Sequence, residues 1–295
     1  MQYLPKNGCT LFSLGVVFKI LPLYRIIRLA MHIVVCIKQV PDAPQVRIDP
    51  KTNTLDRSSA PAILNPYDAH AVQEAVNLKR LYGGRVTVLS MGPPQATDII
   101  RKSLELGADE GVLLSDRAFA GSDTLATSYI LTCGLEKLRS EEPIDLVICG
   151  KQAIDGDTAQ VGPGIARRLN LAQLTYVQKV QSVDVSAGEI VVHRRIDQGH
   201  EVVKAKLPCV LTVEKEINEL SYASLPEMIR AAKYKARVWG IDQLNADKSL
   251  MGLSGSPTTV RKIFAPSQRI GGERLSGSDG DKVQTLVSRL LEKIE

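Results

Sequence analysis

Short apolar runs alternate with helix-like segments between residues 32 and 170, and no other feature of the sequence limits the possible folds as strongly. The apolar runs suit buried strands, and the segments between them repeat apolar residues at helical spacing. In chain order these elements are 32–38, 66–82, 85–91, 95–106, 111–114, 123–138 and 145–149. Strands that alternate with helices form parallel sheets with right-handed crossovers. We therefore expect an α/β fold with a doubly wound, mainly parallel, Rossmann-like sheet.

The starts of three helices carry recognisable signals. Asn65 is a good N-cap, and Pro66 suits the first helical position. Either Ser122 or Asp123 can cap the helix before the fourth strand, and Thr158 can cap the helix after it.

The pattern changes after residue 170. The runs 175–183, 190–195 and 201–204 mix apolar and polar positions, which predicts an antiparallel meander. Residues 246–280 are rich in Gly, Ser and Pro and are expected to form an extended arm. Residues 281–295 regain helical spacing with an apolar face, which we expect to dock on a partner subunit rather than on the chain's own domain.

The first 30 residues differ from the rest in charge. They contain four basic residues and no acidic one, so they carry +4 of the net charge of +5. The remainder has 33 basic and 32 acidic residues. This near balance gives no excess of positive charge for binding nucleic acid. The apolar run in this segment is too interrupted for a membrane span. We interpret residues 1–30 as an over-extended start before Met31 rather than as a membrane anchor. The chain then divides into this extension, a domain at 31–245, and an arm with a helix at 246–295.

Cysteine and histidine positions show no metal-ligand spacing, so we predict no metal site. Three cysteines lie in apolar runs, and we interpret the cysteines as reduced small hydrophobes of a cytoplasmic protein. The five are Cys9, Cys36, Cys133, Cys149 and Cys209.

The fourth strand leads into a polar turn at 150–161 that holds two carboxylates, two side-chain amides and a lysine. A strand, a glycine-containing loop and a helix start form a crevice whose free N–H groups favour phosphate. The turn matches neither a Walker A loop nor a G-x-G-x-x-G fingerprint. It is compatible with a nucleotide-like ligand and also with an ordinary polar loop.

Several stretches resemble one family. They are Val-Val-Cys-Ile-Lys-Gln-Val-Pro-Asp at 34–42, Asn-Pro-Tyr-Asp at 65–68, Val-Thr-Val-Leu-Ser-Met-Gly-Pro at 86–93, Gly-Ala-Asp at 107–109, Gly-Lys-Gln-Ala-Ile-Asp at 150–155, Lys-Leu-Pro at 206–208 and Ser-Leu-Pro at 224–226. In this order, over about residues 31–295, the chain resembles the beta subunit of electron transfer flavoprotein.

The resemblance implies a nucleotide-binding domain at 31–245 and a heterodimer with an alpha subunit that carries FAD. Housekeeping members hold AMP in the beta subunit, whereas bifurcating members hold a second FAD there. The positions that match the family's nucleotide contacts are Cys36, Asn65, Pro66, Tyr67, Asp68, Met91, Gly150, Lys151, Gln152, Ala153, Ile154, Asp155, Gly156, Asp157, Thr158, Ala159, Gln160 and Val161. No residue of this chain is assigned a catalytic role.

Two features favour the bifurcating or nitrogen-fixation-associated branch. Gly156 stands where housekeeping members usually carry an acidic residue, and the run at 115–124 also resembles that branch. This branch implies that NADH delivers hydride to the FAD. One electron then passes to ferredoxin or flavodoxin, and the other passes through the alpha subunit to a dehydrogenase or quinone reductase. The alternatives are a housekeeping carrier, which holds AMP and shuttles electrons from acyl-CoA-type dehydrogenases to a quinone reductase, and a stand-alone ATP-binding or nucleotide-binding domain.

Other side chains have both a functional and a structural interpretation. Ser122, Asp123 and Thr124 begin a helix, so they either cradle a phosphate, such as that of NADH, or serve only as caps. Asp155 and Asp157 suit hydrogen bonds to ribose or backbone N–H groups better than acid–base catalysis. Leu225 matches the leucine with which the family anchors on partner dehydrogenases, and it also suits a half-buried helix start.

Overall fold

A computed structural model describes residues 30–42, 47–49, 54–56, 61–259, 261 and 271–294. The chain divides into two compact units. The main unit comprises Met1–Val46 and Arg57–Thr259, and the second comprises Arg47–Asp56 and Val260–Glu295. The predictions for residues 1–29 fall outside the described residues.

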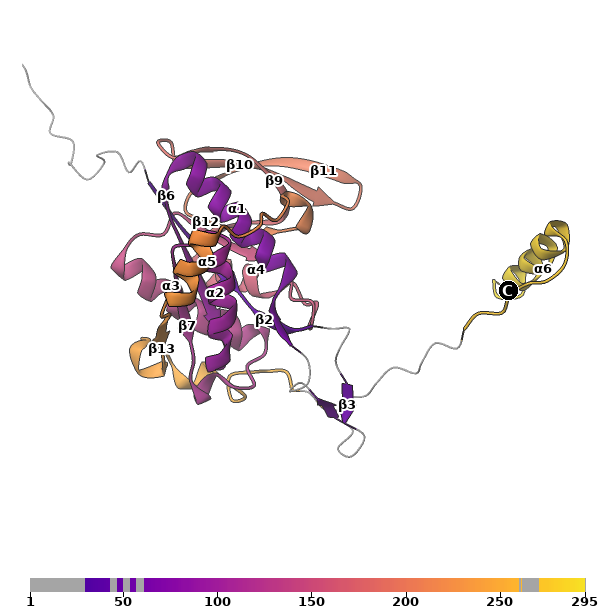
Figure 1. Cartoon of the computed structure of the whole chain (residues 1–295), viewed down its shortest axis with the longest axis horizontal. Coiled ribbons are helices and arrows are strands. Elements are labelled where there is room, and N and C mark those ends of the chain that lie inside the picture. The colour runs from indigo at the N-terminus through magenta and orange to yellow at the C-terminus, as the bar shows by residue number, and fades with distance from the viewer. Residues whose placement is uncertain are drawn as a thin grey trace, which may run out of the picture. The chain divides into compact units, whose positions relative to one another are not determined.

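The main unit holds most of the helices and strands (Figure 1). In chain order they are β1 (Met31–Ile37), β2 (Gln39–Pro41), β5 (Ala62–Leu64), α1 (Pro66–Tyr82), β6 (Gly84–Met91), η3 (Pro94–Ala96), α2 (Thr97–Glu105), β7 (Glu110–Leu114), η4 (Arg117–Phe119), α3 (Thr124–Glu141), β8 (Leu146–Gly150), α4 (Val161–Leu169), β9 (Ala172–Asp184), β10 (Glu189–Ile196), β11 (Gly199–Lys206), β12 (Cys209–Val213), η5 (Lys215–Ile217), α5 (Leu225–Lys233), β13 (Arg237–Trp239), η6 (Ile241–Gln243) and η7 (Lys248–Leu250). The second unit holds β3 (Arg47–Asp49), β4 (Thr54–Asp56) and α6 (Asp279–Leu291).

Among the described residues, one sheet of nine strands runs in the order β11-β10-β9-β12-β8-β1-β6-β7-β13. Neighbours from β9 to β13 along this order pair in parallel, whereas β10 is antiparallel to both β9 and β11. The predicted doubly wound, mainly parallel sheet with an antiparallel meander is therefore confirmed. The edge strand β13 has no counterpart among the predicted strands, because three residues are too few to give a periodic signal.

The central strands are largely apolar and buried because helices cover both faces of the sheet. In β1, Ile33 and Val35 belong to the core that includes side chains of α1 and α2, while Val34 and Cys36 belong to the core that includes those of α3 and α4. Successive residues of a strand point to opposite faces, so one strand contributes to both cores.

The predicted caps of three helices are confirmed in part. Asp123, rather than Ser122, accepts the capping hydrogen bonds of α3. Asn65 occupies the N-cap position of α1, but its side chain makes no capping hydrogen bond. The prediction that Thr158 caps the next helix is wrong, because the N-cap residue of α4 is Gln160.

Two stretches expected to be irregular contain ordered structure. In the long loop after β1, the short strands β2 and β5 pair antiparallel. Residues 248–256, expected at the start of an extended arm, include η7 and the buried side chains of Met251 and Ser256. Composition alone overlooks these contacts, because Gly and Ser also fit tight turns against a folded surface.

The second unit includes the helix predicted near the C-terminus. α6 begins after Ser278, which caps it together with Asp281. Its apolar side chains Val283, Leu286, Val287, Leu290 and Leu291 are between 48% and 61% exposed. Across the described residues, no helix has both the length and the apolar character that crossing a membrane requires.

Candidate functional site

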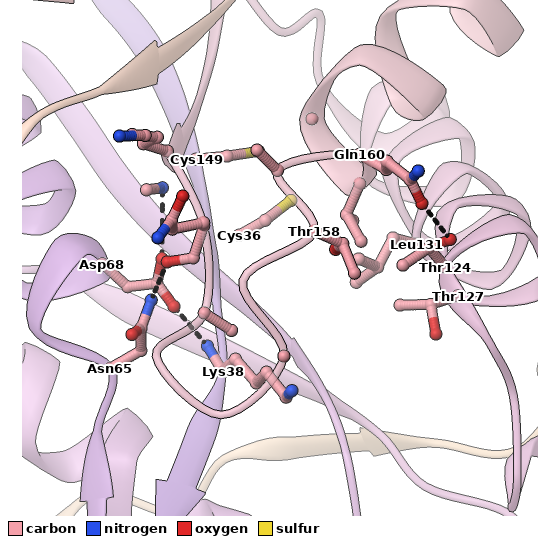
Figure 2. Close-up of a pocket in the computed structure, with 18 of the residues that line it drawn as sticks. Cys36, Lys38, Asn65, Asp68, Thr124, Thr127, Leu131, Cys149, Thr158 and Gln160 are labelled. Atoms are coloured by element: carbon pink, nitrogen blue, oxygen red, sulfur yellow. Dashed lines mark hydrogen bonds between the residues drawn. The ribbon is translucent and has the colours of Figure 1, made fainter. Parts of the chain in front are cut away.

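A cavity of about 330 Å³ opens at the carboxyl ends of β1 and β8. β1 lies between β8 and β6, so the chain builds the sheet to one side of β1 and then returns to the other side. Ligand crevices of doubly wound sheets form where the strand order reverses in this way. The walls come from the ends of those two strands, the starts of α3 and α4, and the loop between β8 and α4 (Figure 2).

Asp68, in the first turn of α1, joins three segments around the cavity. Its carboxylate accepts hydrogen bonds from the backbone N–H groups of Lys38 at 2.8 Å and Gly150 at 3.1 Å, and from the side chain of Asn65 (Figure 2). The residue is only 6% exposed. Burial raises the pKa of Asp68 to about 7, although these hydrogen bonds act in the opposite direction.

The close approach of β8 to α1 depends on Gly150. A Cβ atom at this position would lie 2.3 Å from Oδ1 of Asp68 and 2.7 Å from Cβ of Tyr67. No side chain fits at such distances, so the hydrogen bond from Gly150 to Asp68 requires glycine.

Two side chains from outside the loop hold the segment 151–156 in place. The Asn65 amide donates a hydrogen bond to the carbonyl of Gln152 at 2.9 Å and accepts one from the N–H of Ile154 at 3.2 Å. The Lys38 ammonium pairs with the carboxylate of Asp155 at 2.7 Å. Asn65 therefore fixes the loop instead of capping α1, and β1 contributes an ion pair to the same loop.

The second half of the loop has a strained backbone. Asp157 and Ala159 have φ angles of 50° and 54°. For residues with a Cβ atom this left-handed conformation costs roughly 1–2 kcal/mol, and such strain is concentrated at functional sites. The Asp157 carboxylate accepts a hydrogen bond from the Gln152 amide at 2.7 Å. Asp155 and Asp157 thus bond to the side chains of Lys38 and Gln152, whereas the sequence predicted ribose or backbone N–H groups as their partners.

Two helix starts meet at the cavity. The Thr124 hydroxyl at the start of α3 donates a hydrogen bond to the Gln160 side-chain carbonyl at 2.8 Å (Figure 2). Gln160 makes no side-chain capping bond to α4, and Val161 and Gly162, the first residues of α4, line the cavity. Uncapped N–H groups at a helix start favour an anion, so this wall has the chemistry of a phosphate site.

Residues 252–258 form a clasp on the start of α3. The Thr258 hydroxyl and N–H donate to the Asp123 carboxylate at 2.7 Å and 3.2 Å. The Asp123 N–H donates to the Ser256 hydroxyl at 2.8 Å, and the Gly252 N–H donates to the Ser122 hydroxyl at 3.0 Å. Partial burial acts to raise the pKa of Asp123, but hydrogen bonds from the helix start and from Thr258 leave it below its usual value.

Comparison with known proteins decides the family. The family model described as "Electron transfer flavoprotein domain" matches residues 52–244. The chain is 48% identical to Protein FixA of Azotobacter vinelandii over 269 residues, which cover 90% of this chain and 94% of the relative. It is 45% identical to electron transfer flavoprotein subunit beta of Clostridium acetobutylicum over 263 residues, which cover 89% of this chain and 99% of the relative. The chain belongs to the electron transfer flavoprotein family.

The electron transfer flavoprotein fold brings most of the implied contact positions to one cavity. Those that line it are Cys36, Asn65, Asp68, Met91, Ser122, Asp123, Thr124, Gly150, Lys151, Gln152, Ala153, Gly156, Thr158, Ala159, Gln160 and Val161. Those that do not are Pro66, Tyr67, Ile154, Asp155 and Asp157. Sequence reasoning missed the lining residues Ile37, Lys38, Thr127, Leu131, Cys149 and Gly162. Ile37, Cys149 and Gly162 directly follow or precede implied positions, so a place at a strand end or helix start is the signal that could have found them.

Leu225 lies outside the cavity, on an exposed apolar surface of this electron transfer flavoprotein. It is the first residue of α5 and is 69% exposed. Ser224 and Glu227 form a capping box that fixes this helix start. Tyr222 and Met228 nearby are also exposed. Leu225 is therefore no half-buried helix start, and its role toward a partner remains a proposal.

Replacing Asp123 with Ala should destabilise the start of α3 and release the clasp together. We expect the free energy of unfolding to fall by about 1–2 kcal/mol, because both a helix cap and the bonds to Thr258 are lost. Thr258→Val is the matched control, since it removes the hydroxyl bond and leaves the cap intact. Urea unfolding measures both variants. Equal losses in the two would show that the cap contributes nothing.

The free energy of unfolding should depend on pH because the pKa of Asp68 differs between the folded and unfolded states. Its pKa rises from about 3.9 in the unfolded chain to about 7 in the folded one. The folded state then binds more protons between these values, so this group lowers the stability as pH rises from about 4 to about 7, by up to about 4 kcal/mol. Urea unfolding at pH 5 and pH 7.5 should show wild type losing stability relative to Asp68→Asn. A relative gain would mean that the hydrogen bonds outweigh burial.

Proposed function

We propose that this chain is the beta subunit of a heterodimeric electron transfer flavoprotein of the bifurcating type, and that its cavity holds FAD. The partner is an alpha subunit with a second FAD. The single observation that carries the choice of FAD over AMP is the uncapped start of α4 beside the open position at Gly156.

The residues of the cavity fit a dinucleotide with a diphosphate. The N–H groups of Val161 and Gly162 lie at a helix start without a side-chain cap, where the phosphates of a dinucleotide are favoured. A Cβ atom at Gly156 would meet nothing within 4 Å, so the protein's own packing does not require glycine there. The absence of a side chain instead leaves this part of the lining open and adds no further carboxylate to it, which suits an anionic ligand.

Hydrogen bonds and apolar side chains around the cavity fix its shape before any ligand binds. Asp68 and Asn65 join α1, β1 and the loop after β8 into one wall through hydrogen bonds. Cys36, Met91 and Leu131 supply apolar surface on the walls, which excludes water from that side. A preformed cavity of this kind lowers the ordering cost of binding.

The chemistry that a bound FAD supplies here is acceptance of hydride from NADH, followed by transfer of one electron to ferredoxin or flavodoxin and of the other, through the alpha subunit, to a dehydrogenase or quinone reductase. The chain's own part is to bind and orient the flavin and to exclude water. We assign the exposed Leu225 surface to the dehydrogenase or reductase and the apolar face of α6 to the alpha subunit.

Anaerobic titration of the purified heterodimer with NADH tests this proposal. We expect NADH to bleach the visible absorbance of two flavins per heterodimer. Absence of bleaching by NADH, with bleaching by an acyl-CoA dehydrogenase and its substrate, would support the housekeeping carrier instead. Purification of this chain alone with bound ATP would favour the stand-alone nucleotide-binding domain.

A further inference from the structure

Two thiols lie side by side where β1 and β8 reach the cavity. Cys36 and Cys149 are register partners on these neighbouring parallel strands. Both belong to the same core beneath α3 and α4, so their side chains point to the same face of the sheet. Both also line the cavity, and Figure 2 shows the two sulfur atoms directed into it.

The spacing suits a ligand that binds both sulfurs. Neighbouring strands lie about 4.8 Å apart, and register partners on one face bring their Cβ atoms to a similar separation. Cys36 and Cys149 share a side-chain hydrogen bond and form no disulfide. Each is about one-twentieth exposed and lines the cavity, so a small molecule reaches these side chains through the cavity.

The Cys149 thiol is held in its protonated form. The hydrogen bond from Cys36 and burial raise the pKa of the Cys149 thiol well above its ordinary value. A reagent that attacks a single thiolate should therefore react slowly. A reagent that condenses with two neutral thiols has no such requirement.

We propose that Cys36 and Cys149 form a bidentate site for a thiophilic ligand of the trivalent arsenical class. A monosubstituted arsenic(III) oxide condenses with the two thiols. Two arsenic–sulfur bonds form, the two S–H bonds and the arsenic–oxygen bond break, and the two protons leave with the oxygen as one water molecule. No atom changes its oxidation state in this step. Because the site shares its walls with the nucleotide cavity, the ligand competes with nucleotide, whether that is FAD or AMP.

The other described cysteines lack this arrangement and supply the controls. Cys209 lies in β12, is fully buried and belongs to the core on the opposite face of the sheet. Cys133 lies in α3 and does not line the cavity. Neither has a cysteine as its register or cavity neighbour.

The test uses phenylarsine oxide on the full-length chain in complex with its partner subunit, stripped of cavity nucleotide. Intact mass of this chain should show one phenylarsenic group gained and two hydrogens lost, and peptide mapping should link the segments that contain Cys36 and Cys149. The Cys36→Ser and Cys149→Ser variants should lose this adduct, whereas Cys209→Ser should keep it. Folding of each variant is checked by circular dichroism, and Cys36→Ala replaces any serine variant that fails.

Saturating nucleotide should slow adduct formation by at least about tenfold. No adduct on the wild-type chain, or an adduct that survives in Cys36→Ser, would overturn the dithiol site. An unchanged rate with nucleotide would overturn the claim that the ligands compete. These readouts report on the cysteines and the cavity, so their outcome does not depend on whether NADH reduces the complex.

Discussion

Replacing Gly150 with Ala is expected to damage both the stability of the main unit and its cavity. The added methyl would lie 2.3 Å from Oδ1 of Asp68 and 2.8 Å from the backbone carbon of Tyr67. These atoms belong to α1, whose Ala71, Val72 and Ala75 are fully buried, so the helix cannot move aside freely. Overpacking of this kind costs typically 1–3 kcal/mol, and we expect a loss at the upper end together with loss of the Gly150–Asp68 hydrogen bond.

Urea unfolding of Gly150→Ala measures the first effect, and nucleotide retained after gel filtration measures the second. We expect retention to fall at least about tenfold. Gly156→Ala is the matched control, since a Cβ atom there has open space and the φ angle is ordinary. If Gly150→Ala unfolded at the same urea concentration as this control, the described packing of β8 against α1 would be wrong.

Replacing Gly156 with Asp is expected to weaken nucleotide binding without harming the fold. A Cβ atom at this position would meet nothing within 4 Å, so the added side chain starts in open space. A carboxylate close to a bound diphosphate repels it by roughly 1–3 kcal/mol at the effective dielectric of a protein surface, which is about a 10-fold to 100-fold loss of affinity. The flavin of the alpha subunit should be unaffected.

Flavin and AMP extracted from the Gly156→Asp heterodimer measure this effect, with Gly156→Ala as the control for loss of glycine alone. We expect the beta-subunit flavin to be lost and heterodimer assembly to persist. A variant that keeps both flavins would show that Gly156 does not face the diphosphate. A variant that fails to assemble would show that this position serves the subunit interface.

The parts of the fold that follow from short-range pattern could be predicted from the sequence. The strands β1, β6, β7 and β8 are mainly apolar because helices cover both faces, and their alternation with helices indicates a parallel sheet. Pro66 and Gly83 mark the limits of α1, since one suits the first turn and the other takes a φ of 73° at the end.

The details that depend on contacts between distant residues could not be predicted. Asn65 is a sound N-cap by type, yet its amide bonds to the loop 87 to 89 residues further along the chain. Thr158 fails as a cap because the neighbouring Asp157 and Ala159 adopt left-handed angles that delay the start of α4. The clasp around Thr258 is likewise a long-range contact, and it is hidden in a stretch whose composition indicates an arm.

Counting the nucleotides bound to the wild-type heterodimer tests the central claim most directly. The complex is denatured, its nucleotides are separated by chromatography, and FAD and AMP are quantified against protein. The uncapped start of α4 and the open lining at Gly156 predict two FAD and no AMP per heterodimer. One FAD with one AMP would contradict the assignment of FAD to this cavity.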